Sequence, residues 1–463
     1  MHSPYAALKV ISARTAATAV LLLGGAIVYL INFPGSMEDD SFAQLVEGRT
    51  GSYSFWHPPI MSWMLGVSDA LPGPPEAYFV AFDMLLAFGA LASLVWLRRR
   101  VSWGAVACGV IVLLLPQLML LQAVVWKDGL FADLCLAAFV CLAHADSHWL
   151  NVRIRYGLVI ASIGFIALAM LARQNGFVML PFAAGALGWS ATRIFGWRKG
   201  LLHAAAFAAL SAGLALGINA LLALRSDGLP AQEEQFKVLH LYDLTGMVRR
   251  DPSLPLPVLD RQSPGLAHLI RTEGVRLWSP VKNDTLELSG KIVAALEDTP
   301  ADVLTRQWQE AVLRHPGLYL AVRGQLFAWV FWPVHVELCH PYHIGDEGNP
   351  DDLAMLGAQP RMDARDVALG DYAHAFVGTP VFWHPFYALI VLGVMVVLLR
   401  RRARGDIAIA ALLASALVFT ASFFVISIAC DYRYLYVIDL SALAGLLYLS
   451  ADPGTKRGPE GPL

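Results

Sequence analysis

The sequence predicts an all-α polytopic membrane protein with about ten transmembrane helices, interfacial helices in its first outer loop and a mixed outer (periplasmic) cap. Hydrophobic residues make up 57% of the 463 residues and charged residues only 15%, whereas a soluble domain carries about 25% charged residues. The mean hydropathy of +0.55 agrees with this class and excludes a disordered chain. The formal net charge of −2 argues against nucleic acid as a partner.

Ten apolar runs are candidates for membrane spans. A helix needs about 20 apolar residues to cross the hydrocarbon, because its backbone polar groups must be satisfied within the segment. The runs, several of them short, are 13–33, 76–97, 101–121, 129–145, 157–172, 177–191, 201–224, 384–400, 407–428 and 435–450. The first run is long and is followed by no small-residue cleavage site, so we do not expect a cleaved signal peptide.

Basic residues indicate how these spans are oriented, because Lys/Arg clusters face the cytoplasm. With Lys9 and Arg14 inside and ten spans, every later cluster falls inside. These clusters lie at 98–100, 153–155, 193–199, 400–404 and 456–457. Counting residues 318–338 as an eleventh span would place the cluster at 400–404 outside. Both termini are therefore expected to be cytoplasmic.

With these ten spans, the chain divides into three parts. Residues 1–224 form an N-terminal transmembrane core whose first outer loop spans 34–75, and 384–463 form the C-terminal helices and a cytoplasmic tail. Residues 225–383 form an outer cap, rich in proline and charge. Within the cap we expect 318–338 to be an amphipathic helix at the outer membrane interface. Its interfacial anchors would be Tyr319, Trp329 and Trp332.

The first outer loop carries three consecutive acids, Glu38, Asp39 and Asp40. Mutual repulsion beside lipid is expected to raise the pKa of at least one carboxylate, which suits a general base. A solvated helix cap is the alternative. Further along the loop, Trp56 and His57 precede two prolines that fix the turn. This turn either holds His57 near phosphate groups or only anchors the loop.

Cations follow three of the later spans on the same outer side. Lys127 and Asp128 begin the fourth helix, where the helix dipole also favours an anion. Arg173 lies in a short turn, where an unpaired charge near membrane depth costs roughly 2.5–3.5 kcal/mol. Arg433 and Tyr434 lie before the last span. Taken singly, each is a boundary cap or a structural ion pair; together they oppose one acidic loop.

These groups indicate a substrate with a hydroxyl to deprotonate, a phosphate leaving group and a long apolar tail. A polyprenyl-phosphate sugar is such a molecule. Cations would stabilise the departing phosphate, while a carboxylate deprotonates the acceptor hydroxyl.

Through these motifs the sequence resembles the GT-C superfamily of membrane glycosyltransferases. The nearest branch is the protein O-mannosyltransferase and aminoarabinose-transferase-like one. The resemblance covers residues 10–225 and extends to the rest only by layout. It rests on Asp39-Asp40, the run from His57 to Trp63, Asp128, the turn from Arg173 to Gly176, and Arg433-Tyr434. It implies an inverting transfer from a lipid-phosphate sugar at the outer face of a bacterial inner membrane.

Roles follow from the motifs and the resemblance together. Asp40 is preferred as base when the helix start with Gln44 is aligned, and Asp39 when the Asp-Asp pair is aligned. Asp128 would orient the acceptor or a cation. The donor phosphate would be held by Lys127, Arg173, Arg433, His57 and Tyr434. The acceptor, whether glycan, lipid or protein, and the sugar are left open.

Other signals keep rival interpretations open. The cluster of His335, Glu337, Cys339, His340 and His343 matches no zinc spacing, so no metal site is predicted, although a divalent cation is left as an option. Asp83 and Asp133, inside spans, are the best argument for a lipid or sugar transporter or flippase. A polysaccharide polymerase or ligase is the second rival. Cys339 and Cys430 both face outward and could pair.

Overall fold

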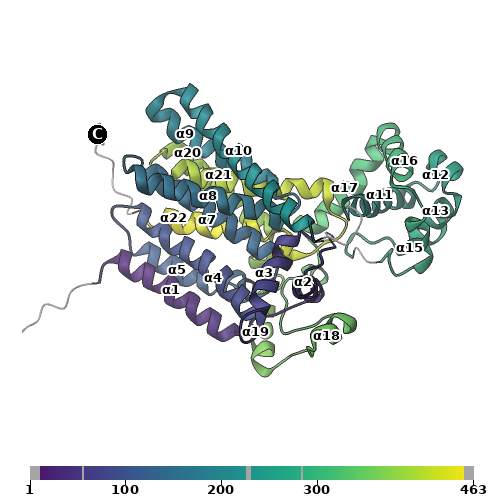
Figure 1. Ribbon diagram of the computed structural model, residues 1–463, viewed down its shortest axis with the longest axis horizontal. Coiled ribbons are helices and arrows are strands. Elements are labelled where there is room, and N and C mark those ends of the chain that lie inside the picture. The colour runs from purple at the N-terminus through teal and green to yellow at the C-terminus, as the bar shows by residue number, and fades with distance from the viewer. Residues whose placement is uncertain (1–10, 55–56, 226–230, 283–284, 453–463) are drawn as a thin grey trace, which may run out of the picture.

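The computed structural model describes residues 11–54, 57–225, 231–282 and 285–452 (Figure 1). Its regular structure over these ranges is helical, joined by a few isolated β-bridges. Trp56, Lys9 and the cluster at 456–457 lie outside the described residues. The orientation that depends on the two terminal clusters therefore stays a prediction.

The chain is an all-α polytopic membrane protein. In the described residues, eight helices are long and apolar enough to cross a membrane, and all eight fall on predicted runs. They are α1 (Ala13–Asn32), α4 (Pro75–Leu94, continued by η1, Val95–Leu97), α7 (Lys127–Ser147), α8 (Val152–Ala172), α9 (Met179–Phe195, preceded by η3, Gly176–Val178), α10 (Trp197–Ala223), α20 (His384–Arg401) and α21 (Asp406–Ile426).

The other two predicted runs differ from straight spans. The run at 101–121 is α5 (Gly104–Leu113) followed by α6 (Pro116–Met119) and η2 (Leu121–Ala123), with a bend of 67°. Pro116 lacks a backbone N–H and holds the residue before it extended, so the helix breaks there. The last run is α22 (Tyr436–Ser450), only 15 residues long and preceded by η7 (Tyr432–Leu435).

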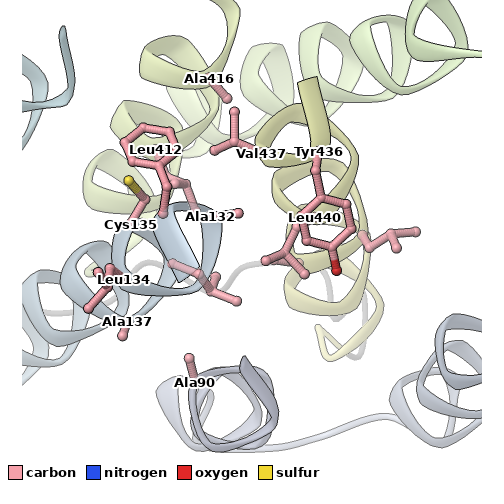
Figure 2. Packing of buried hydrophobic residues seen from close by; sticks show 14 of the residues in the cluster. Ala90, Ala132, Leu134, Cys135, Ala137, Leu412, Ala416, Tyr436, Val437 and Leu440 are labelled. Atoms are coloured by element: carbon pink, nitrogen blue, oxygen red, sulfur yellow. The ribbon is translucent and has the colours of Figure 1, made fainter. Parts of the chain in front are cut away.

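Helix α7 is the centre of the bundle. Over an apolar stretch of 18 residues in this helix, 89% is buried, and the helix packs against α4, α8, α21 and α22. Figure 2 shows small and branched side chains of four helices meeting there: Ala90, Ala132, Cys135, Leu412, Ala416, Val437 and Leu440. Small residues let helix backbones approach closely in a membrane. Of the free cysteines at 108, 135 and 141, Cys135 lies in this core and Cys108 packs against it as a small residue.

The first outer loop folds into two short helices, as expected, α2 (Asp39–Thr50) and α3 (Pro59–Asp69). They cross at Gly48 and Gly66, where a Cβ on either residue would collide with the other backbone. This close crossing fixes α2 and its first turn of acids against the bundle.

The outer segment forms a second hydrophobic cluster of its own, seen beyond one end of the bundle in Figure 1. Its helices are α11 (Ala231–Arg250), α12 (Pro257–Gln262), α13 (Pro264–Leu269), a π-helical turn η4 (Ile270–Gly274), α14 (Val275–Leu277), α15 (Gly290–Glu297), α16 (Ala301–Arg314) and α17 (Pro316–Phe331). The chain returns to the bundle through η5 (Val336–Cys339), α18 (Pro350–Leu356), α19 (Ala364–His374) and η6 (Pro380–Phe382).

Helix α17 covers most of the predicted interfacial stretch at 318–338. It packs against α11, α16 and α21, and at 16 residues it is not among the membrane-length helices. Arg323 in its middle is completely buried and pairs with Asp243 of α11 at 2.5 Å. Its guanidinium also donates to the carbonyl of Ser427 at 2.7 Å. Trp332 is exposed, and its place at a lipid interface stays a prediction.

Candidate functional site

A cavity of about 880 Å³ opens where the first outer loop, the start of α7, the turn after α8, α11 and the turn between α21 and α22 meet. This volume is in the range of small-molecule sites. Seven of the eight predicted site residues line it: Asp39, Asp40, His57, Lys127, Arg173, Arg433 and Tyr434. The eighth, Asp128, lies behind the wall with 2% of its surface exposed.

Backbone pairing places the acids of the first loop at this cavity. Ser36 bridges to Val124, just before α7, and Met37 bridges to Asp346 of the outer segment. The chain then enters α2 with Glu38 as its N-cap. Asp39 and Asp40 occupy the first turn, where the positive end of the helix dipole favours carboxylates.

Asp40 is the meeting point of the predicted cations. Its carboxylate lies 2.9 Å from Arg433 Nη2, 3.5 Å from His57 Nε2 and 3.6 Å from Lys127 Nζ. Burial opposes ionisation of Asp40, but the charge of Lys127 and the neighbouring imidazole outweigh it, so the pKa of Asp40 lies below its usual range. Asp40 is therefore ionised at neutral pH.

His57 is held neutral in the same cluster. Burial, followed by the positive charge of Lys127, lowers the pKa of His57 to about 4. Its Nδ1 lies 2.8 Å from Lys127 Nζ, which donates to it, and this leaves the proton on Nε2, facing Asp40. His57 thus lies between Lys127, which donates a hydrogen bond to it, and the carboxylate of Asp40.

The expected rise in carboxylate pKa occurs at Asp39 and not at Asp40. Burial and the charges of Glu347 and Asp40 raise the pKa of Asp39. Asp39 is exposed at the lip of the cavity, and no ion pair to it occurs in the described ranges. The geometry therefore separates two acids that the sequence leaves equivalent.

Arg433 is surrounded by carboxylates. It pairs with Glu38 through Nη1, with Asp40 through Nη2 and with Asp431 through Nε at 2.8 Å. Burial lowers the pKa of Arg433 to about 10, which still leaves it charged at neutral pH. Burial, together with the charge of Asp128, raises the pKa of Asp431 well above its usual range.

Asp128 faces the arginines and not the cavity. It forms an ion pair with Arg173 and lies 3.9 Å from Arg433 Nε. The expectation that an anionic group must pair with Arg173 is thus met. The expected role of Asp128 in orienting an acceptor is not supported by this placement, because its carboxylate is buried between the two arginines and does not line the cavity.

Aromatic rings support the two arginines. The guanidinium of Arg433 lies 5.4 Å from the Trp126 ring, and that of Arg173 lies 5.5 Å from both Phe423 and Tyr434. Such contacts stabilise a cation electrostatically. Tyr434 therefore meets the cation Arg173 through its ring.

One wall of the cavity is apolar. It is formed by η3, the end of α21, the turn after α21 and α11, with Phe177, Phe236, Phe423, Ile426 and Ile428. Phe177 and Phe236 are 60% and 58% exposed. The charged cluster is therefore continuous with a surface suited to hydrocarbon.

The opposite wall comes from the outer segment, with His340, Tyr342, His343 and Glu347. A disulfide between Cys339 and Cys430 joins this wall to the turn that bears Arg433, so the pairing left open by the sequence is present. Cys339 is consequently no thiolate ligand. In the part of the chain that the structure describes, no group of three or more His, Cys, Asp or Glu residues could hold a metal ion.

Sequence reasoning counted Glu38 among the three acids of the first loop, at least one of which suits a general base, but did not include it among the site residues. It assigned no role to Trp126 or Glu347. Trp126 adjoins the Lys127-Asp128 motif and could have been included on that ground. Glu347 is brought to the cavity by backbone hydrogen bonds to Met37, which leave no side-chain pattern.

The acids that favoured a transporter lie elsewhere. Asp83 and Asp133 are completely buried between α4 and α7 and hydrogen-bond to each other. Gln122 donates to Asp133 and accepts from Tyr436 at 2.7 Å. Neither aspartate lines the cavity.

Comparisons with known proteins give little further guidance. No family model and no curated protein matches the chain. Solved structures of the Archaeoglobus fulgidus oligosaccharyltransferase superimpose with TM-scores of 0.41 and 0.40 at 15% identity. One is a complex with zinc and sulfate, and another holds an inhibitory peptide and a dolichol-phosphate. The alignments cover 93–94% of this chain but only 48–50% of those chains, and TM-scores of this size do not establish a common fold.

Proposed function

We propose that the protein is an inverting glycosyltransferase that moves a sugar from a polyprenyl-phosphate donor to an acceptor hydroxyl. One observation carries the proposal: a single cavity holds an ionised carboxylate, three cations and an apolar wall. Phosphate, sugar and hydrocarbon are the three chemistries of such a donor. Membrane lipid would hold the rest of its tail.

In this proposal Lys127, Arg173 and Arg433 stabilise the charge that develops on the departing phosphate. His57 accepts a hydrogen bond from Lys127 and keeps it in place. The ring of Tyr434 stabilises the guanidinium of Arg173 through a cation–π contact. Asp128 is a positioning residue whose carboxylate lies between both arginines.

Asp40 is the proposed base, in preference to Asp39. In the free protein the pKa of Asp40 is depressed by Lys127, by the neighbouring imidazole and by Arg173. A donor phosphate competes for the same cations, so its binding releases Asp40 from them and raises the basicity of the carboxylate. The base would then become active only when the donor is present.

We place this reaction at the outer face of a bacterial inner membrane, with both termini in the cytoplasm. The disulfide at the cavity supports that side, because structural disulfides form in oxidising compartments. The acceptor can be a glycan, a lipid or a protein. A polymerase or ligase would share the donor chemistry and differ only in the acceptor.

The test is a transfer assay on the purified protein in detergent, with a panel of polyprenyl-phosphate sugars and hydroxyl acceptors. We expect release of polyprenyl phosphate with one donor, and its loss in a double Asp39→Asn, Asp40→Asn variant that still binds donor. Asp302→Asn removes an exposed acid far from the cavity and serves as the control. Turnover by the double variant would overturn the base assignment. Translocation in vesicles without bond cleavage would favour a transporter.

A further inference from the structure

Glu38 is the N-cap residue of α2, but its side chain makes no capping hydrogen bond. N-cap side chains usually satisfy a free backbone N–H of the first turn. The carboxylate of Glu38 instead reaches across the cavity to Nη1 of Arg433, which is supplied by the far end of the chain. Glu38 thus forms a long-range ion pair with Arg433 in place of the local capping hydrogen bond.

The ion pair matters because all three guanidinium nitrogens of Arg433 already face a carboxylate. Nη1 faces Glu38, Nη2 faces Asp40 and Nε faces Asp431. A guanidinium binds phosphate through two parallel N–H groups. A phosphate can therefore reach Arg433 in that way only if at least one of these carboxylates moves aside.

The three carboxylates are not equally free to move. Asp431 lies two residues from Arg433 and also accepts the backbone N–H of Arg433 at 3.3 Å. Asp40 is shared with Lys127 and His57. In the described part of the chain, the side chain of Glu38 pairs with Arg433 alone. Glu38 also has the longest side chain of the three.

From this arrangement we infer that Glu38 is an exchangeable counter-ion of Arg433, which yields to the donor phosphate and returns to displace the product phosphate. The inference rests on the proposed function and adds a residue that governs donor affinity and product release. No covalent bond changes in this exchange. One anion replaces another on the same guanidinium.

Removing the charge of Glu38 should therefore tighten phosphate binding. For Glu38→Gln we expect the Kd for unglycosylated polyprenyl phosphate to fall about tenfold in detergent, the size that one competing charge-assisted contact would give. Single-turnover transfer should be unchanged or faster. Steady-state kcat should fall, because release of polyprenyl phosphate becomes limiting.

Glu347→Gln is the matched control, because it removes the same charge from the same cavity without touching Arg433. Glu38→Asp keeps the charge on a shorter side chain and should restore most of the wild-type release rate. Thermal unfolding of each variant shows whether it is folded, and Glu38→Ala, which also removes the charge, replaces Glu38→Gln if that variant is not.

Tighter binding in Glu38→Gln, with little change in Glu347→Gln, would support the inference. Unchanged or weaker binding in Glu38→Gln would overturn it and leave the proposed function standing. Equal tightening in both variants would also overturn it, since general charge would then explain the effect. A wild-type protein that binds no polyprenyl phosphate would overturn the proposed function itself.

Discussion

The bundle carries an arginine–carboxylate network at each end, and the two differ in how they are satisfied. At the inner end, Asp406 begins α21 with no exposed surface; Arg401 pairs with both of its oxygens at 2.7 Å. Tyr448 and Arg98 add contacts at 2.9 and 3.0 Å. At the outer end, Arg433 is outnumbered by carboxylates and faces a cavity.

Both networks consist of arginines and carboxylates, so this difference distinguishes a structural charge cluster from a functional one. In the inner network, Asp406 receives donors from Arg98, Arg401 and Tyr448, and Asp452 also pairs with Arg401, so the two arginines are matched by two carboxylates. In the outer network, several acids compete for few cations, so an added anion can change the partners. Excess of one charge beside open space, and not the mere presence of ion pairs, indicates a site for a ligand.

The largest effect expected from this comparison is on activity at the outer network. Asp40→Asn should lower the transfer rate by about 10²–10⁴-fold, the range for loss of a general base. Asp39→Asn, at the lip of the cavity, should lower it far less. Initial rates with the donor identified in the assay above check this order. The reverse order would make Asp39 the base.

The next effect is on stability at the inner network. Asp406→Asn should lower the free energy of unfolding by about 3–5 kcal/mol, because it removes the fully buried carboxylate shared by Arg98 and Arg401 and leaves Arg401 with Asp452 alone. The molecules that remain folded should keep their activity. Thermal unfolding and specific activity in detergent measure the two quantities. Loss of activity without loss of stability would show that the comparison between the two ends is wrong.

The smallest effect concerns pH at the outer network. Because the folded pKa of His57 is about 4, below its ordinary value of 6.5, the unfolded chain binds more protons between these pH values. Stability should therefore rise as pH increases from 4 to 6.5 and stay level above it, as far as His57 is concerned. His57→Gln should remove about 1–3 kcal/mol of that rise. Unfolding curves across this range, compared with wild type, test it, and an unchanged slope would contradict it.

Composition and periodicity were enough to predict most of the bundle. Hydrophobic runs locate the spans, because in lipid the backbone N–H and C=O groups can hydrogen-bond only within a helix. Pro116 could have been used to predict the break in the third run, since proline removes the donor that a straight helix needs. The short last helix is buried among its neighbours and so needs less apolar length than a lipid-facing span.

The candidate site was predictable where motifs adjoin span ends, because those ends must gather on one side of a membrane. Asp40, Lys127 and Arg433 converge for that reason. The sequence could not show that Asp128 turns inward to the arginines, since both orientations fit the start of a helix. It also could not locate Glu347, whose position depends on backbone pairing with Met37.

The bond between Cys339 and Cys430 has a consequence for how a newly made molecule matures. It fastens the outer segment beside the turn that presents Arg433, and bonds of this kind close only after a chain reaches an oxidising environment. A freshly inserted chain would thus hold its two cavity walls together by noncovalent contacts alone. Full assembly of the cleft would then follow arrival in that oxidising environment.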